Sequence, residues 1–154
     1  MKKPGQRYTV AVDFDGVLHS YTSPWVNART IPDPPVEGAI QWLADIVTRF
    51  DVAITSTRNS QWFGRWAMKS WLREHLWQFM WPKANEAVSG WTHGDVDEWA
   101  GRLADEVLSH VSFPRHKPPA LVYLDDRALR FDGPGSWPTP DQIHAARPWN
   151  KVSR

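Results

Sequence analysis

Three short apolar runs divide this chain of 154 residues, and they limit its fold more than any other feature. The runs are Tyr8–Val12, Asp51–Ser56 and Ala120–Leu124. Each is too short for a helix, is rich in β-branched or aromatic residues and has a polar C-terminal end, as buried strands do. Between the runs, apolar residues recur at three- and four-residue spacing, which predicts helices. Strands that alternate with helices predict an α/β fold, with a central parallel sheet covered by helices on both faces.

The helical spacing covers three segments and leaves two parts of the chain less regular. The segments run from Val36 to Phe50, from Trp62 to Leu76 and from Trp99 to Val111. Within the stretch Trp81–Asp95, Ala87 and Val88 allow a fourth, short strand. After Arg130 the chain is rich in turn residues, and we expect a short helix near Asp141–Ala145. Because no internal repeat occurs and the length suits one domain, residues 1–154 are expected to form a single domain.

The composition excludes several classes of protein. The chain has no cysteine, so it holds neither a disulfide scaffold nor a cysteine-ligated zinc or iron–sulfur site. Its longest apolar run has far fewer than the roughly 20 residues needed to span a bilayer, and acids interrupt the apolar stretch after the basic N-terminus, which disfavours a signal peptide. A net charge of +1 and a pI near 8.1 are unlike those of a dedicated nucleic-acid binder. We therefore expect a soluble, cytoplasmic protein with no membrane partner.

Tryptophan is unusually frequent, with 11 residues spread over several segments of the chain. Indole rings can serve as stacking platforms for bases. Because tryptophan is highly buried on average in proteins, we expect most of these side chains to fill the core and the seams between helices instead.

Polar and acidic residues follow each of the three predicted strands. Asp13-Phe14-Asp15-Gly16 follows the first, Thr55-Ser56-Thr57-Arg58 the second and Asp125-Asp126-Arg127 the third, with Lys117 shortly before it. Ligands of parallel α/β sheets bind in the crevice beyond the carboxyl ends of the strands. In an extended chain, residues i and i+2 project to the same side, so Asp13 and Asp15 can converge on one point. Asp125 or Asp126 would join them from a neighbouring strand.

Such a cluster of carboxylates requires a cation or shared protons, because the negative charges repel one another. Oxygen ligands favour a hard ion, and a site with few protein ligands plus a substrate phosphate suits Mg²⁺. Lys117, Arg58 and the hydroxyl of Ser56 would supply the hydrogen-bond donors that a phosphate group needs, and Gly16 would let the backbone approach a ligand closely. The alternative is that the acids serve only as caps and turns, which are common after strands. The combination of two acidic pairs with a hydroxyl and a lysine favours the functional interpretation.

These residues resemble the motifs of the haloacid-dehalogenase (HAD) superfamily over roughly residues 8–133. Asp13-Phe14-Asp15-Gly16-Val17 resembles the first motif, a hydrophobic strand followed by DxDG and Thr or Val. Ser56 resembles the second motif, Lys117 the third, and Leu124-Asp125-Asp126 the fourth. The resemblance implies a three-layer, Rossmann-like core with a central parallel sheet.

The activity that this resemblance implies is hydrolysis of a phosphomonoester through an aspartyl-phosphate, with Asp13 as the nucleophile. Asp15 would protonate the leaving oxygen and then deprotonate the hydrolytic water. The presence of this second acid disfavours dehalogenation. Mg²⁺ would be held by the Asp13 side chain, the backbone carbonyl of Asp15 and Asp125 or Asp126.

The same resemblance assigns the phosphate contacts. Ser56, which begins a Ser-Thr-Arg sequence, and Lys117 would contact the phosphoryl oxygens, with Arg58 as a third contact. Thr55 is the alternative for the hydroxyl. Lys83 is the alternative lysine, because Lys117 lies close to the fourth motif in the sequence.

Little chain separates the first motif from the first predicted helix, so the resemblance implies a member with no large cap domain and an exposed site. Residues 17–34 would form a flap, in which His19, Tyr21, Trp25 and Arg29 are candidate contacts for a base or a sugar. Ordinary loop residues, with Trp25 packed against the core, are the alternative interpretation of these positions. Residues 134–154 would form a C-terminal extension.

The chain also resembles three groups within the superfamily, namely 5′(3′)-deoxyribonucleotidases, the 3′-phosphatase domains of polynucleotide kinase-phosphatases, and small stand-alone proteins of actinobacterial phages. These resemblances imply a small phosphorylated substrate of the nucleotide type, and a location in the host cytoplasm if the chain is phage-encoded. A polynucleotide 3′-phosphatase that processes nucleic-acid ends and a non-catalytic HAD-fold binding protein are the alternatives. The oligomeric state does not follow from the sequence.

Overall fold

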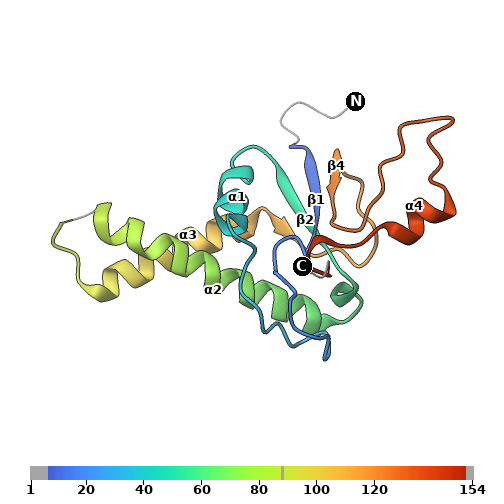
Figure 1. The fold of residues 1–154 in the computed structure, drawn as a ribbon. Helices are drawn as coiled ribbons and strands as arrows, with labels where there is room; N and C mark the ends of the chain where they lie inside the picture. The colour runs from blue at the N-terminus through green and yellow to red at the C-terminus, as the bar shows by residue number, and fades with distance from the viewer. Residues whose placement is uncertain (1–6, 88, 152–154) are drawn as a thin grey trace.

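A small parallel sheet positions all other elements. The computed structural model describes residues 7–87 and 89–151, and its strands are β1 (Thr9–Asp13), β2 (Asp51–Thr55), β3 (Val111–Ser112) and β4 (Val122–Leu124). They form one four-stranded, all-parallel sheet in the order β3-β2-β1-β4 (Figure 1). The three strands expected from the apolar runs are confirmed, as is the α/β class with a central parallel sheet.

The helices agree in number and approximate position with the spacing of apolar residues. In the described chain they are α1 (Ala39–Ile46), α2 (Trp62–Ala87), α3 (His93–Ser109) and α4 (Pro140–Ala145), with short 3₁₀ helices at Thr57–Ser60 and Trp149–Lys151. Each segment that was expected to be helical overlaps one of the four α-helices, but α2 extends beyond Leu76 to Ala87 and α3 begins at His93, before Trp99. None of the described helices is both long enough and apolar enough to span a membrane.

The fourth strand lies elsewhere than expected. Ala87 is the last residue of α2, so it belongs to a helix, and Val88 lies outside the described residues. The end of α2 packs against α3 through a small apolar cluster of Ala84, Val96 and Ala100, bordered by Trp77, Met80, Trp81 and Trp99. This packing, with the capping box of Thr92 and Asp95 that begins α3, makes the segment a helical hairpin. The additional strand is β3, which begins at Val111, where the helical pattern was expected to end.

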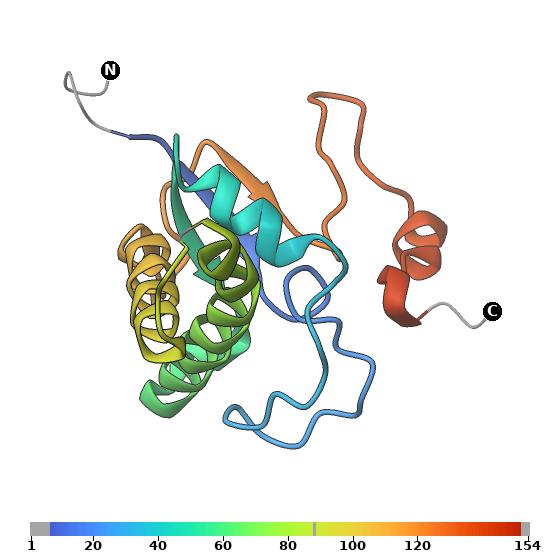
Figure 2. The ribbon, with the colours of Figure 1, turned by 90° about the vertical axis from the view of Figure 1, so that its left-hand side faces the viewer.

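The helices α1, α2 and α3 all cover the same face of the sheet, so the described structure has two layers instead of the expected three. They pack in one core around Val10, Val12, Val52 and Ile54 of the two central strands. The chain moves across the sheet in one direction, from β1 to β2 and then to β3. Because connections between parallel strands are right-handed, the helices in both connections lie on the same face of the sheet. The connection from β3 to β4 contains no helix, and α4 stands apart from the sheet (Figures 1 and 2). The opposite face therefore has no helical cover in this part of the chain, and Tyr123 on β4 is 40% exposed.

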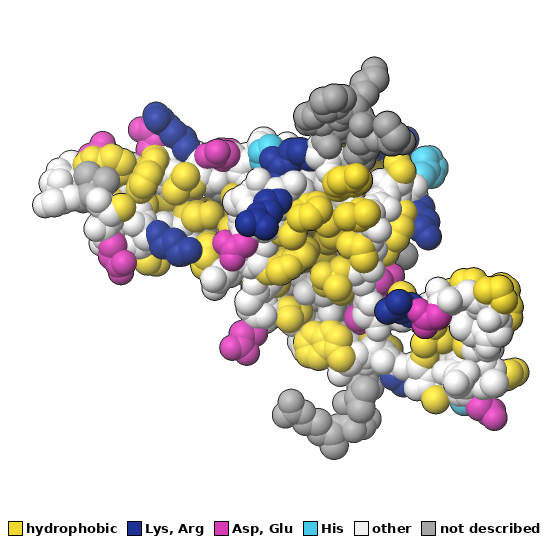
Figure 3. Space-filling model, turned by 90° about the horizontal axis from the view of Figure 1, so that it is seen from above, with side chains coloured by type: hydrophobic (Ala, Val, Ile, Leu, Met, Phe, Trp, Pro, Cys, Tyr) yellow, Lys and Arg dark blue, Asp and Glu magenta, His cyan; other side chains and the backbone are white. Residues whose placement is uncertain are grey.

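The expectation that most tryptophan side chains fill the core is wrong. Trp71 is buried, four others are half-buried, and six are exposed. The exposed ones are Trp25, Trp62, Trp66, Trp91, Trp137 and Trp149. Because helices cover only one face of the sheet, there are few seams between layers in which indole rings can be buried. Figure 3 shows hydrophobic side chains gathered over the middle of one face of the molecule.

The C-terminal segment returns to the start of the loop between β1 and α1. This loop, which was expected to form a flap, contains only isolated bridge pairs and no regular helix or strand. Trp149 Nε1 donates a hydrogen bond to the carbonyl of Gly16 at 2.6 Å. Asn150 Nδ2 donates to the carbonyls of Ser20 and Tyr21, each at 3.0 Å. These bonds hold the base of the flap beside the carboxyl end of β1.

Candidate active site

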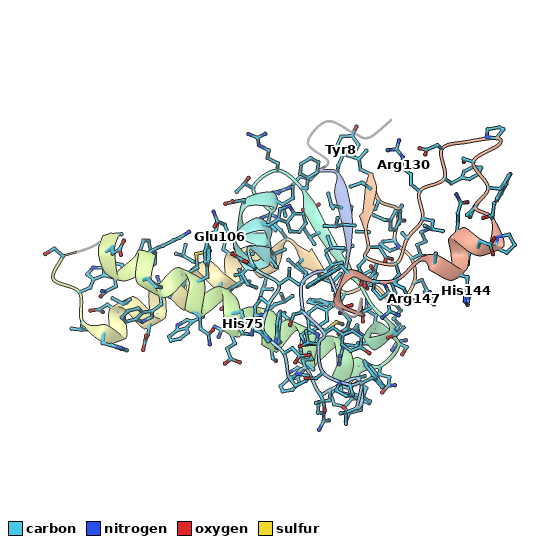
Figure 4. The ribbon with its side chains drawn as sticks, viewed as in Figure 1. Tyr8, His75, Glu106, Arg130, His144 and Arg147 are labelled. Atoms are coloured by element: carbon cyan, nitrogen blue, oxygen red, sulfur yellow. The ribbon has the colours of Figure 1, made fainter. Side chains whose placement is uncertain are left out.

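The acidic ends of β1 and β4 lie side by side. The two strands are parallel neighbours, and their register brings Asp13 beside Asp125. Carboxylate oxygens of Asp13, Asp125 and Asp126 all lie within 4.8 Å of one another. Tyr8, which is labelled in Figure 4, lies just before the first residue of β1, at the end of the strand away from Asp13. The structure thus brings together three of the four carboxylates that the sequence predicts to converge.

Asp126 is buried without the partners that a buried carboxylate requires. Its side chain is 4% exposed, and neither carboxylate oxygen has a hydrogen-bond partner among the described residues. Arg127 Nε lies 4.0 Å from Asp126 Oδ1, at the limit of an ion pair. Burial raises the pKa of Asp126, and the negative charge of Asp125 raises it further. Because an uncompensated buried carboxylate is costly, a bound cation fits this position.

The chemistry of the cluster fits Mg²⁺ in particular. Asp13, Asp125 and Asp126 offer carboxylate oxygens only, which is the donor set of hard divalent ions. Asp125 is exposed, so the site is open to water and to a substrate. Mg²⁺ usually keeps several waters and binds through few carboxylates together with substrate phosphates.

Gly16 is required by the position of Asp126. Its φ is +100°, and a Cβ atom added to Gly16 would lie 2.5 Å from Asp126 Oδ2. The sequence predicts that Gly16 lets the backbone approach a ligand, whereas in the structure it gives room to a carboxylate of the cluster. Gly16, after β1, and Asp126, after β4, are therefore coupled by direct packing.

Replacing Gly16 by alanine is expected to destabilise the protein by about 1–3 kcal/mol and to weaken Mg²⁺ binding, because the residue is strained and its Cβ displaces Asp126. Gly90→Ala is the matched control, since Gly90 has a similar φ of +93° and no atom within 4 Å of the added Cβ. Thermal melts with and without Mg²⁺ measure both effects. Only Gly16→Ala should lose the increase in Tm that Mg²⁺ produces, and an equal response of both variants would contradict the role of Gly16.

Asp13 is a half-buried carboxylate that borders a cavity. Burial raises the pKa of Asp13 from 3.8 to about 7, and the negative charge of Asp125 contributes to this rise. Asp13 borders a cavity of about 210 Å³ beyond the carboxyl end of β1. A cation bound to the cluster would lower the pKa of Asp13 and favour the ionised form, which is the form that acts as a nucleophile.

Asp15 is engaged by other side chains instead of the acidic cluster. Arg58 Nε donates to Asp15 Oδ2 at 2.9 Å and Arg58 Nη2 donates to Oδ1 at 3.0 Å. His19 Nδ1 lies 2.9 Å from Asp15 Oδ1. Burial alone would raise the pKa of Asp15, but the hydrogen bonds from His19 and Arg58 hold it below the ordinary value of 3.8. Asp15 is therefore ionised at neutral pH.

Arg58 has partners other than the phosphate contact that the sequence predicts. Its side chain is 1% exposed, and besides Asp15 it binds the flap. Arg58 Nη1 donates to the carbonyls of Asn27, Ala28 and Thr30 at distances of 2.9–3.2 Å. The guanidinium thus ties the flap to the end of β1, and it borders neither cavity beside the cluster.

His19 supports Asp15 from the buried side. The residue is fully buried, and its Nε2 accepts a hydrogen bond from the backbone N–H of Asp33 at 3.2 Å. The ring proton therefore lies on Nδ1 and is donated to Asp15. The interpretation of His19 as a contact for a base or sugar is wrong, because its ring does not reach the surface.

The other candidate residues of the flap divide into two groups. Tyr21 and Trp25 border the 210 Å³ cavity together with Asp13, so they are placed where a substrate would be. Arg29 instead has its guanidinium 5.6 Å from the centre of the Phe63 ring, and it does not border this cavity.

Two cavities meet at the cluster. The first, of about 210 Å³, is lined by Asp13, Asp15, Tyr21, Trp25, Ser56, Thr57, Asp125 and Arg127. The second, of about 420 Å³, is lined by Thr55, Ser56, Asn59, Pro114, Arg115, His116, Lys117, Tyr123, Asp125 and Ala128. Ser56 and Asp125 border both cavities. We call them the acid cavity and the basic cavity.

The structure distinguishes between the alternative hydroxyls and lysines. Ser56 Oγ lies 3.3 Å from Asp15 Oδ2 and borders both cavities, whereas Thr55 borders only the basic cavity. Lys117 borders the basic cavity beside Ser56. Lys83 lies near the end of α2 with its Nζ 3.8 Å from the centre of the Phe79 ring, and it borders neither cavity. The geometry favours Ser56 and Lys117.

Two features of the site could not be expected from the sequence. His19 and Arg58 form a buried pair around Asp15, and Trp149 and Asn150 hold the base of the flap. The sequence does show a histidine four residues after Asp15 and a Pro-Trp-Asn sequence near the C-terminus. Neither pattern identifies the residues that these side chains contact. The contacts of Arg58, Trp149 and Asn150 join segments that are far apart along the chain and that only the fold brings together.

Comparison of the chain with protein-family models, with curated proteins and with solved structures finds no match in any of the three. The function is therefore inferred from the residues and their geometry. The main observations are three adjacent carboxylates, one of them buried without a partner, beside a cavity that contains a hydroxyl and aromatic rings.

Proposed function

We propose that the protein is a Mg²⁺-dependent phosphomonoester hydrolase of the HAD type, which forms an aspartyl-phosphate on Asp13 and acts on a nucleotide-type substrate. The observation that carries this proposal is the buried, unpartnered carboxylate of Asp126 beside Asp13 and Asp125. A purely structural cluster of acids would be expected to have hydrogen-bond or cation partners within the protein. A cation shared with a substrate supplies the missing partner.

Asp13, Asp125 and Asp126 would hold Mg²⁺, which would neutralise negative charge on the phosphoryl oxygens. The ionised carboxylate of Asp13 attacks phosphorus, a new O–P bond forms, and the bond from phosphorus to the leaving oxygen breaks. Ser56 and Lys117 supply donors for the phosphoryl oxygens from the side of the basic cavity.

Asp15 transfers the protons of the reaction. Its contacts with Arg58 and His19 favour the ionised carboxylate, which accepts a proton from the water that hydrolyses the aspartyl-phosphate. Protonation of the leaving oxygen requires the acid form, which these contacts disfavour; the proton that Asp15 takes from the hydrolytic water is the one that it gives to the leaving oxygen of the next substrate. We therefore expect substrates whose leaving group is a stable anion to depend least on Asp15.

The aromatic residues of the acid cavity support a nucleotide-type substrate. Tyr21 and Trp25 border this cavity together with Asp13, and aromatic side chains are effective stacking surfaces for bases. Trp25 is itself supported by Arg58, whose guanidinium carbon lies 4.5 Å from the centre of the indole ring. The same side chain that orders Asp15 thus also orders the aromatic wall.

The metal-free protein is expected to lose stability as the pH rises from about 4 to about 7. Asp13 in the folded state keeps its proton up to a pKa of about 7, whereas the unfolded chain releases it near 3.8. The folded state binds more protons over this range, so raising the pH favours unfolding. The contribution of Asp13 to this pH dependence is measured by comparing Tm against pH for the wild type and for Asp13→Asn. The wild type should fall more steeply, Mg²⁺ should reduce its slope, and parallel curves would contradict the buried position of Asp13.

The proposed activity is tested with p-nitrophenyl phosphate and a panel of nucleoside monophosphates, sugar phosphates and phosphorylated oligonucleotides, with Mg²⁺ or with a chelator. Hydrolysis that requires Mg²⁺ and is fastest with nucleotide substrates is the expected result. Hydrolysis unaffected by the chelator would contradict the metal site. Absence of turnover across the panel, in protein that melts cooperatively and responds to Mg²⁺, would favour a binding protein instead.

A further inference from the structure

The basic cavity adjoins the acidic cluster of the proposed phosphoryl site. It shares Ser56 and Asp125 with the acid cavity and extends over the face of the sheet that has no helical cover, where Tyr123 is exposed. Its volume of about 420 Å³ is in the range of cavities that hold small ligands. A group attached to a phosphate at the cluster can therefore extend into it.

Three consecutive residues with nitrogen donors line this cavity. Arg115, His116 and Lys117 all border it, all are exposed, and none forms an ion pair with an acid of the described chain. Other exposed arginines do have such partners, as Arg73 has with Asp105. Because Lys117 is assigned to the phosphoryl oxygens, Arg115 and His116 are the donors available to a second anion.

The loop that carries these residues is fixed to the catalytic edge of the sheet. Asn59 is buried, and its Nδ2 donates to the carbonyl of Ile54 at 2.7 Å and to that of Pro114 at 2.9 Å. Lys117 Nζ lies 4.5 Å from the centre of the Tyr123 ring, and the Tyr123 hydroxyl donates to the carbonyl of Pro118. The start and the end of the loop are thus each tied to a strand that ends at the site.

We propose that the basic cavity binds a second phosphate group carried by the leaving group of the substrate. This inference rests on the proposed hydrolase function. The planar fork of an arginine is a standard partner of phosphate oxygens, and Arg115 borders the basic cavity beside His116. The preferred substrates are phosphomonoesters with a neighbouring phosphate, a chemistry shared by nucleoside bisphosphates and by phosphorylated oligonucleotide ends.

The test compares kcat/KM for a nucleoside 3′,5′-bisphosphate with kcat/KM for the 3′- and 5′-monophosphates of the same nucleoside. One charge-assisted contact contributes about 1.5–3 kcal/mol, so we expect a preference of about tenfold or more for the bisphosphate. Arg115→Gln should reduce this ratio about tenfold. Arg102→Gln removes an exposed arginine of α3 that pairs with Glu98, and as the matched control it should leave the ratio unchanged.

A second arm replaces the bisphosphate by short oligonucleotides phosphorylated at the 3′ or 5′ end. A preference for these over the bisphosphate identifies a strand end as the source of the second phosphate, and the reverse order identifies a free nucleotide. Equal kcat/KM for mono- and bisphosphates and oligonucleotides, or a ratio that Arg115→Gln does not change, overturns the inference while the hydrolase function stands. If the wild type hydrolyses none of these compounds nor p-nitrophenyl phosphate, the proposed function itself fails, and this inference fails with it.

Discussion

Asp13→Asn is expected to reduce phosphomonoester hydrolysis by at least about a thousandfold while the protein remains folded, which is the scale of loss seen when a covalent nucleophile is removed. Asparagine has nearly the same size and shape as aspartate, but its amide does not attack phosphorus. The substitution also removes the Asp13 carboxyl group, whose pKa burial raises to about 7. The metal-free variant should therefore be as stable as the wild type, or more stable, at a pH above 7.

The assay is hydrolysis of p-nitrophenyl phosphate at saturating Mg²⁺, with the thermal melt of each variant measured in the same buffer. Asp45→Asn is the matched control, because Asp45 is an exposed residue of α1 that lies outside both cavities. It should retain full activity. Turnover of Asp13→Asn within a few-fold of the wild type would exclude Asp13 as the nucleophile.

Arg58→Ala is expected to lower the free energy of unfolding by about 3–5 kcal/mol, the usual cost of removing one partner of a buried ion pair. The substitution leaves Asp15 buried without its cation and three flap carbonyls without their donor. Activity should also fall, since Asp15 and Trp25 both lose the side chain that orders them. Arg58→Lys should recover part of the stability, because lysine restores the positive charge but lacks the planar guanidinium group that donates several hydrogen bonds at once.

Arg73→Ala is the matched control for this loss of stability. Arg73 binds both carboxylate oxygens of Asp105, at 2.7 and 3.0 Å, but both side chains are about half exposed, so its removal should cost about 1 kcal/mol or less. Denaturant unfolding of the three variants gives the comparison. Equal losses for Arg58→Ala and Arg73→Ala would show that Arg58 does not stabilise the flap and Asp15 in the way described.

The sheet and the convergence of the acids were predictable because both depend on local patterns. Each strand is a short apolar run, and each run ends in polar residues that a parallel sheet must bring to one edge. The register of β1 and β4 then places Asp13 beside Asp125. The strand expected at Ala87 and Val88 is not found at Ala87, because a short apolar pair fits the end of a helix as well as a strand.

The layers of the fold and the partners of Arg58 could not be predicted in the same way. An apolar strand does not reveal that helices cover only one of its faces, and with no helix between β3 and β4 the Tyr123 side chain stays exposed. Arg58 was expected to face a phosphate, because its position in the motif does not reveal that flap carbonyls from residues 27–30 consume its donors. Contacts between distant segments decide both features.

The most direct test of the central claim is to look for a phosphoryl group on Asp13. Wild-type protein is mixed with p-nitrophenyl phosphate and Mg²⁺, quenched in acid within the first turnovers, digested and analysed by mass spectrometry. The peptide that contains Asp13 is expected to gain the mass of one phosphoryl group, and the gain should be absent with chelator and in Asp13→Asn. Steady turnover with no phosphorylated peptide, or a phosphoryl group on another residue, would contradict the account.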